Sequence, residues 1–269
     1  MTARWSWATL ACAVVANAAF DAPVPCAAEA ASGDGQVARA ATGGALESNP
    51  ALAASGGWRA GAGSTHPYGI DALELSGFWA GRGHAGRVPG WQARWKLLRA
   101  GSVYREDQIA LDLAQAVGNW QVGAGWRGGR SELEGEIPDW IHGLALGATF
   151  APNRLVTVGI AWEDLSALAV SDSRLARPWT LRSGVAAVPF DSAWVSRVGW
   201  EYRQREPVRW SFGQEMRWGV LSLRAGFGVQ PWVLAFGAGV RWSGIGIDWA
   251  QEGDPRLGWQ QHWSISVER

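Results

Sequence analysis

Apolar side chains alternate with polar or small ones along much of the sequence. In Val208–Trp218 one set of alternate positions is Val, Trp, Phe, Gln, Met and Trp, and the other is Arg, Ser, Gly, Glu and Arg. The same alternation recurs in Leu221–Gly228 and Trp232–Trp242. A period of two residues is that of a β-strand with one apolar and one polar face. The pattern therefore predicts an all-β fold.

Extending this pattern along the chain predicts fourteen strands. They are Trp58–His66, Ile70–Gly83, Trp91–Leu98, Asp107–Ala116, Trp120–Arg130, Trp140–Phe150, Arg154–Trp162, Arg177–Val188, Ala193–Tyr202, Val208–Arg217, Val220–Gly228, Trp232–Trp242, Gly244–Ala250 and Gly258–Glu268. The first four are the least regular, and Gln108–Val117 also fits a helix.

The links between these strands form two groups. From the fourth strand on, every second link is tight: Val117–Asn119, Ala151–Asn153, Pro189–Ser192, Trp218–Gly219 and Ser243. The intervening links are longer: Ser131–Asp139, Glu163–Leu175, Arg203–Pro207 and Gln251–Leu257. Short turns at one end and longer loops at the other are typical of transmembrane antiparallel barrels with an even number of strands.

The chain contains 20 tryptophans, which is too many for an ordinary core. Several lie an even number of residues apart on one predicted strand, so they share a face: Trp120 with Trp126, Trp194 with Trp200, Trp210 with Trp218, Trp232 with Trp242, and Trp259 with Trp263. On strands tilted by about 40°, most of these spacings correspond to roughly 15–25 Å of depth across a membrane. This depth approaches the thickness of about 25 Å of the apolar band that lies between the two aromatic girdles of a transmembrane barrel. The alternative is a soluble barrel or sandwich that buries its Trp face, but a small barrel has no room for so many rings. The spacing favours a transmembrane barrel facing a lipid bilayer in the bacterial outer membrane.

Charge and the N-terminal segment place further limits on the chain. The 24 basic and 24 acidic residues give a net charge of +0, which excludes a basic nucleic-acid-binding protein. Residues 1–30 read as a signal peptide, with an uncharged stretch from Trp5 to Phe20 and a cleavage site at Ala28–Ala30. Both cysteines, Cys12 and Cys26, lie in this segment, so the mature chain is expected to contain none.

The predicted polar face supplies the candidate lumen residues. Glu215 and Arg224 lie on the same side of consecutive strands joined by a tight turn, so we expect them to approach each other. They form a polar constriction or a structural ion pair. Six further charges fall on this face: Arg182, Arg197, Glu201, Arg209, Arg217 and Arg241. The arginines could bind an anionic head group, or the charges could neutralise one another.

The residues give little support for catalysis or a cofactor. His262 and Ser264 share a face, as in some outer-membrane lipid hydrolases, but no third residue that would orient them is identifiable. The four histidines show no metal-ligand spacing, and the two G-x-G-x-x-G matches, at Gly81–Gly86 and Gly123–Gly128, do not open a βαβ unit. We therefore expect a non-enzymatic protein without a metal or cofactor.

The C-terminal half resembles the FadL-like outer-membrane channels, and in particular the branch of the type IX secretion proteins PorV and PorQ. The resembling stretches are Gly213–Glu215, Leu223–Gly226, Gly237–Arg241, Ile247–Ala250 and Gly258–Val267. Near the other end, Asn49-Pro50-Ala51 is similar to the Asn-Pro-Ala motif that this family carries in a plug within a 14-stranded barrel.

The resemblance implies a domain plan and two functions. Residues 31–57 would form an N-terminal plug, and residues 58–269 the barrel. One function is passive passage of hydrophobic or amphipathic small molecules. The other is a secretion accessory that docks protein cargo on its loops, chiefly Glu163–Leu175. A lipid hydrolase using His262 and Ser264 is a third hypothesis, and the oligomeric state stays open.

Overall fold

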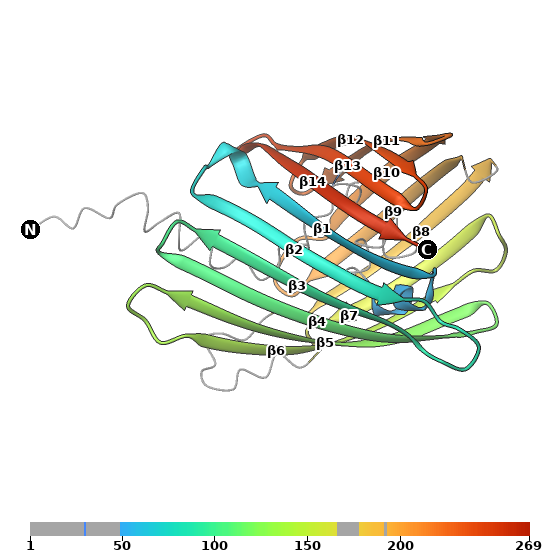
Figure 1. Cartoon of the computed structure of the whole chain (residues 1–269), viewed down its shortest axis with the longest axis horizontal. Coiled ribbons are helices and arrows are strands. Elements are labelled where there is room, and N and C mark those ends of the chain that lie inside the picture. Colours follow the sequence, from blue (N-terminus) through green and yellow to red (C-terminus); the bar gives the residue numbers. More distant parts are fainter. Residues whose placement is uncertain (1–29, 31–48, 166–177, 191–192) are drawn as a thin grey trace, which may run out of the picture.

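The computed structural model describes residues 30, 49–165, 178–190 and 193–269, which form a tilted barrel of long strands (Figure 1). Its fourteen strands are β1 (Trp58–His66), β2 (Leu73–Arg82), β3 (Gly90–Ala100), β4 (Tyr104–Val117), β5 (Trp120–Leu133), β6 (Asp139–Phe150), β7 (Val156–Glu163), β8 (Thr180–Phe190), β9 (Trp194–Arg203), β10 (Arg209–Trp218), β11 (Leu221–Val229), β12 (Val233–Trp242), β13 (Ile245–Asp254) and β14 (Gly258–Glu268).

Each strand pairs with its neighbours in the sequence, and β14 pairs with β1 to close the barrel. All pairs are antiparallel, and the closing pair runs from Arg59 opposite Glu268 to His66 opposite Gln261. Closure leaves no exposed edge, which a strand in lipid requires. The predicted all-β barrel of fourteen strands is confirmed, and the segment that also fitted a helix, Gln108–Val117, lies in β4.

The links differ less in length than the sequence predicted. The segment Gln251–Leu257 was predicted to be a loop, but β13 continues to Asp254 and leaves only residues 255–257 as the link. The prediction was wrong because Gln251 and Gly253 on the outer face break the apolar pattern, although backbone pairing with β14 continues.

The two ends of the barrel differ in their links. The longest link, 164–179, lies at the end that we call the loop end. The tight links at 118–119, 219–220 and 243–244 lie at the other end, which we call the turn end.

The barrel is apolar outside and polar inside. Trp218 and Trp242 are 80% and 72% exposed on the outer face, whereas Arg197 and Glu215 in the lumen are each only 1% exposed. This inverts the arrangement of a water-soluble protein and suits a barrel whose outer wall meets lipid. Trp79 is an exception among the tryptophans, since its indole is buried inside against Gly61 of β1.

Two short 3-10 helices accompany the strands. The first, η2 (Pro50–Ala54), lies against β2 to β6 near the turn end, and the second, η3 (Pro67–Gly69), lies in the link between β1 and β2 (Figure 1). In the described part of the chain, no helix is long and apolar enough to cross a membrane. Apart from Ala30, the predicted signal peptide lies outside the described residues, as do residues 31–48 of the predicted plug and most of the loop Glu163–Leu175.

Candidate functional site

Glu215 on β10 is the centre of a buried group of charges in the lumen. Its carboxylate accepts hydrogen bonds from Arg197 Nη2 at 2.8 Å and from Arg217 Nε at 2.7 Å. Arg224, its register partner on β11, has Nη2 3.7 Å from Oε1. Because one carboxylate cannot neutralise three guanidinium groups, a second one takes part: Arg224 Nη1 donates to Asp248 Oδ1 at 2.6 Å. We call these five residues the Glu215 cluster.

A second chain of charges crosses the inner wall from β5 to β10. Glu163 on β7 accepts from Arg127 Nη2 at 3.0 Å and from Arg182 Nη1 at 2.6 Å. Arg182 Nε in turn donates to Glu201 Oε2 at 2.6 Å, and Arg209 Nη1 lies 4.0 Å from Glu201 Oε1. Each charge in this chain therefore has an opposite charge beside it, and Glu206, with Oε2 2.7 Å from Arg209 Nη2, supplies the third carboxylate for the three arginines.

The structure brings together seven of the eight predicted lumen charges in these two groups. Arg241 stands apart, with Nη1 3.4 Å from Glu268 Oε2. Sequence reasoning missed Arg127, Glu163 and Asp248, because it placed Glu163 in the loop Glu163–Leu175 and gave Arg127 and Asp248 no role in the lumen. The signal was present, since each of the three occupies an inward position in the alternation of its strand.

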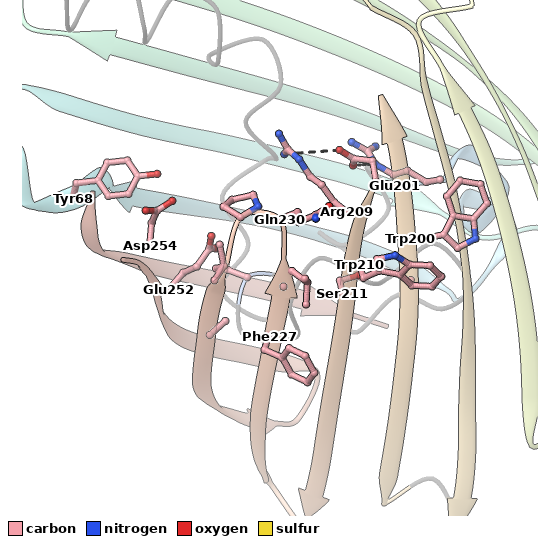
Figure 2. A pocket seen from close by; sticks show the side chains of 18 residues that line it. Tyr68, Trp200, Glu201, Arg209, Trp210, Ser211, Phe227, Gln230, Glu252 and Asp254 are labelled. Carbon is pink, nitrogen blue, oxygen red and sulfur yellow. Dashed lines mark hydrogen bonds and ion pairs between the residues drawn. The ribbon is translucent and has the colours of Figure 1, made fainter. Parts of the chain in front are cut away.

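A cavity of about 230 Å³ lies in the lumen toward the loop end. Figure 2 shows Tyr68, Glu252 and Asp254 on one side of it, and Arg209 with Glu201 on the other. Small residues on β9 to β12 leave the space open: Gly199, Ser211, Gly228 and Ala235. The walls therefore offer both charged groups and apolar surface, the mixture expected of a site for small amphipathic molecules.

Tyr68 contributes a neutral hydroxyl to this cavity. Burial raises the pKa of Tyr68 above its ordinary value, and the nearby carboxylates of Glu252 and Asp254 raise it further. The phenol therefore remains protonated at neutral pH and available as a hydrogen-bond donor.

The Asn-Pro-Ala motif is seated on the inner wall at the turn end. Asn49 caps η2 by accepting a hydrogen bond from Ala51 N at 3.0 Å, and its Nδ2 donates to the carbonyl oxygen of Ala148 on β6 at 3.2 Å. At the other end of η2, Arg59 of β1 donates from Nη1 to Ser55 O at 2.6 Å. Hydrogen bonds therefore hold residues 49–55 to the inner wall at both ends, to β6 at Asn49 and to β1 at Ser55.

Glycines in the wall make room for this segment. A Cβ atom built on Gly147 would lie 1.9 Å from Asn49 Oδ1, one on Gly123 would lie 2.6 Å from Ala51 N, and one on Gly90 would lie 2.2 Å from Ala53 O. No real Cβ atom tolerates such contacts, so these three positions require glycine while η2 stays in place. We call Gly90, Gly123 and Gly147 the glycine seat.

His262 and Ser264 face the lumen on β14, and both are buried. His262 Nδ1 lies 2.9 Å from Thr65 Oγ1, and Nε2 lies 3.7 Å from Glu252 Oε2. The imidazole therefore shares a hydrogen bond with Thr65. In the described part of the chain, no three His, Cys, Asp or Glu side chains are grouped to hold a metal.

Comparisons with known proteins give matches in structure alone. No protein-family model and no curated protein matches the chain. Among solved structures, the Pseudomonas putida toluene transporter TodX is 15% identical, with 91% of this chain and 97% of that chain covered and a TM-score of 0.59. A TodX deltaS2S3 mutant, described as a monoaromatic hydrocarbon channel, is 14% identical, with 92% and 98% covered and a TM-score of 0.64. The Acinetobacter baumannii outer membrane protein Omp33 is 8% identical, with 81% and 100% covered and a TM-score of 0.54.

At these identities the likeness establishes the fold. The chain has the fold of bacterial outer-membrane β-barrels, as TodX and Omp33 do. The finer resemblance to the PorV and PorQ branch finds no support among these structures.

Proposed function

We propose that this chain is a passive outer-membrane channel for small hydrophobic or amphipathic molecules, closed near its turn end by a plug. The observation that carries the proposal is the cavity between Tyr68, Glu252 and Glu201, which lies inside a closed barrel whose outer wall is apolar. The plug motif at the opposite end of the lumen adds a place where passage is controlled. The fold shared with a toluene transporter agrees with this proposal but does not name the solute.

The cavity limits the size of the solute. A cavity of about 150 Å³ lined by apolar side chains accommodates benzene, so the roughly 230 Å³ here accommodates a single aromatic ring with substituents. Charged groups on two walls favour a ring that carries a polar substituent. We infer that small substituted aromatic compounds are the preferred class.

Blocking the cavity tests this function. Ser211 is a small inward residue on its wall, and Ser211→Trp is expected to reduce uptake of a labelled small aromatic compound to the level of cells lacking the chain, because the indole fills the space. Val240→Trp places the same ring on the exposed outer face of β12 and is expected to leave uptake unchanged. Heat-dependent migration on SDS gels verifies that both variants fold.

If both variants transport like the unmodified protein, solutes do not pass through this cavity and the channel proposal fails. The secretion-accessory alternative rests on the sequence resemblance and on the loop Glu163–Leu175, and it predicts that secreted proteins co-purify with the barrel. The non-enzymatic assignment predicts no lipid cleavage by the purified protein, and cleavage that Ser264→Ala abolishes would replace it with the hydrolase.

A further inference from the structure

The outer wall carries an amide group in the middle of its apolar face. On β10 the outward side chains are Trp210, Phe212, Gln214, Met216 and Trp218, and Gln214 is exposed. It lies four residues from each of the two tryptophans that mark the ends of the strand. A primary amide at this position is far from both polar boundaries of a bilayer.

The hydrogen-bonding capacity of this amide is only partly used. Gln214 Oε1 accepts a hydrogen bond from Ser196 Oγ at 3.1 Å, and Ser196 Oγ accepts one from Trp194 Nε1, also at 3.1 Å. Within the described residues, this is the only hydrogen bond of the Gln214 side chain, so its –NH2 group has no partner among them. Exchanging the oxygen and nitrogen of the amide would leave an unpaired oxygen instead.

Hydrocarbon chains cannot satisfy this group, because they offer neither donors nor acceptors, and an unpaired amide in an apolar medium costs several kcal/mol. A polar side chain in the middle of a lipid-facing wall is therefore a candidate contact with another protein, as it is between transmembrane helices. The surroundings fit a contact surface: the register partner on β11 is the small Ala225, and the exposed Met216, Leu223 and Phe227 lie around it.

We propose that the outer face of β9 to β11, centred on Gln214, is the interface with a second copy of this chain. An amide contains both a donor and an acceptor, so two copies related by a two-fold axis can satisfy each other with the same residue. In a head-to-tail contact, Gln214 of one copy would instead meet a different residue of the other copy. That residue would need a polar group without a hydrogen-bond partner in the middle of another strand. Ser183, which also faces outward in mid-strand on β8, is already bonded to the carbonyl oxygen of Gly159 at 3.1 Å. This interface does not depend on what crosses the lumen.

Cysteine cross-linking in intact membranes tests the interface. Both native cysteines lie in the predicted signal peptide, so a single introduced thiol reports on one position. Under mild oxidation, Gln214→Cys is expected to give several-fold more disulfide-linked dimer than Leu144→Cys, which places a thiol on the exposed outer face of β6. Equal cross-linking of the two variants, or none at Gln214→Cys, would overturn the proposal, as would a cross-linked product with the mass of a different protein.

A second variant tests the role of the amide itself. Gln214→Leu keeps the apolar character of the wall but removes the shared hydrogen bonds, so the dimer fraction in lipid nanodiscs is expected to fall several-fold. Heat-dependent gel migration shows independently that the barrel is folded. An unmodified protein that is monomeric in nanodiscs, or a Gln214→Leu variant that dimerises equally well, contradicts the proposal.

Discussion

Replacing Glu215 with alanine is expected to lower the free energy of unfolding by about 3–5 kcal/mol. The carboxylate lies within 2.8 Å of Arg197, 2.7 Å of Arg217 and 3.7 Å of Arg224, so its removal leaves guanidinium groups buried beside one another. Within the Glu215 cluster, Asp248, which is bonded to Arg224, would be the one carboxylate left beside three arginines. Urea-induced unfolding in lipid vesicles, followed by tryptophan fluorescence, measures the change.

Glu132 provides the matched control. It also pairs with an arginine, since Arg130 Nη2 lies 3.1 Å from its Oε2, but the pair is on the outer face of β5 with 42% and 48% of the two side chains exposed. Glu132→Ala is expected to cost at most about 1 kcal/mol, because water screens exposed ion pairs. Similar losses for the two variants would show that water fills the lumen around Glu215 and that its charges are not buried.

Adding a single methyl group at Gly147 is expected to open the turn end of the barrel. In Gly147→Ala the new Cβ would lie 1.9 Å from Asn49 Oδ1 and 3.0 Å from Pro50 Cδ. Asn49 is fully buried and holds both Ala51 N and Ala148 O, so it cannot move aside without releasing η2. The conductance of single channels in planar bilayers should therefore increase several-fold over that of the unmodified protein.

Gly228→Ala is the control for this variant. Gly228 also faces the lumen, but a Cβ at this position would approach no atom closer than 3.7 Å. Because Gly228 lines the cavity toward the loop end and does not touch η2, the conductance of this variant is expected not to rise above that of the unmodified protein. Arg59→Gln, which weakens the contact with Ser55 O, should act in the same direction as Gly147→Ala. If neither changes the conductance, residues 49–55 do not control passage.

The sequence was sufficient to predict the barrel because lipid imposes a simple rule on every strand. Outward positions are mostly apolar where they meet the membrane, and β10 is readable from its own residues because Trp210, Phe212, Met216 and Trp218 occupy four of its five outward positions. The same rule explains the error at Gln251–Leu257. Polar residues take the outward positions there while the backbone ladder continues, and the pattern that defines a strand disappears before the strand ends.

The lumen was harder to predict because its contacts join strands that are distant in the sequence. Glu215 and Arg224 lie on one hairpin and could be paired from the tight turn between them. The partners Arg127 and Glu163 lie on strands that are separated by β6, and their pairing follows from the curvature of the closed wall. Glycine is also ambiguous in sequence, so the role of Gly147 becomes clear only when Asn49 lies against it.

Fluorescence quenching in brominated lipids tests the central claim most directly. The protein is reconstituted in vesicles whose acyl chains carry bromine, a quencher that reaches only side chains in contact with lipid. With tryptophans such as Trp126, Trp194 and Trp263 exposed on the outer wall, we predict strong quenching by the lipid and weak quenching by iodide in the water. Emission that is insensitive to brominated lipid but quenched by iodide would contradict the membrane barrel and the account of its lumen.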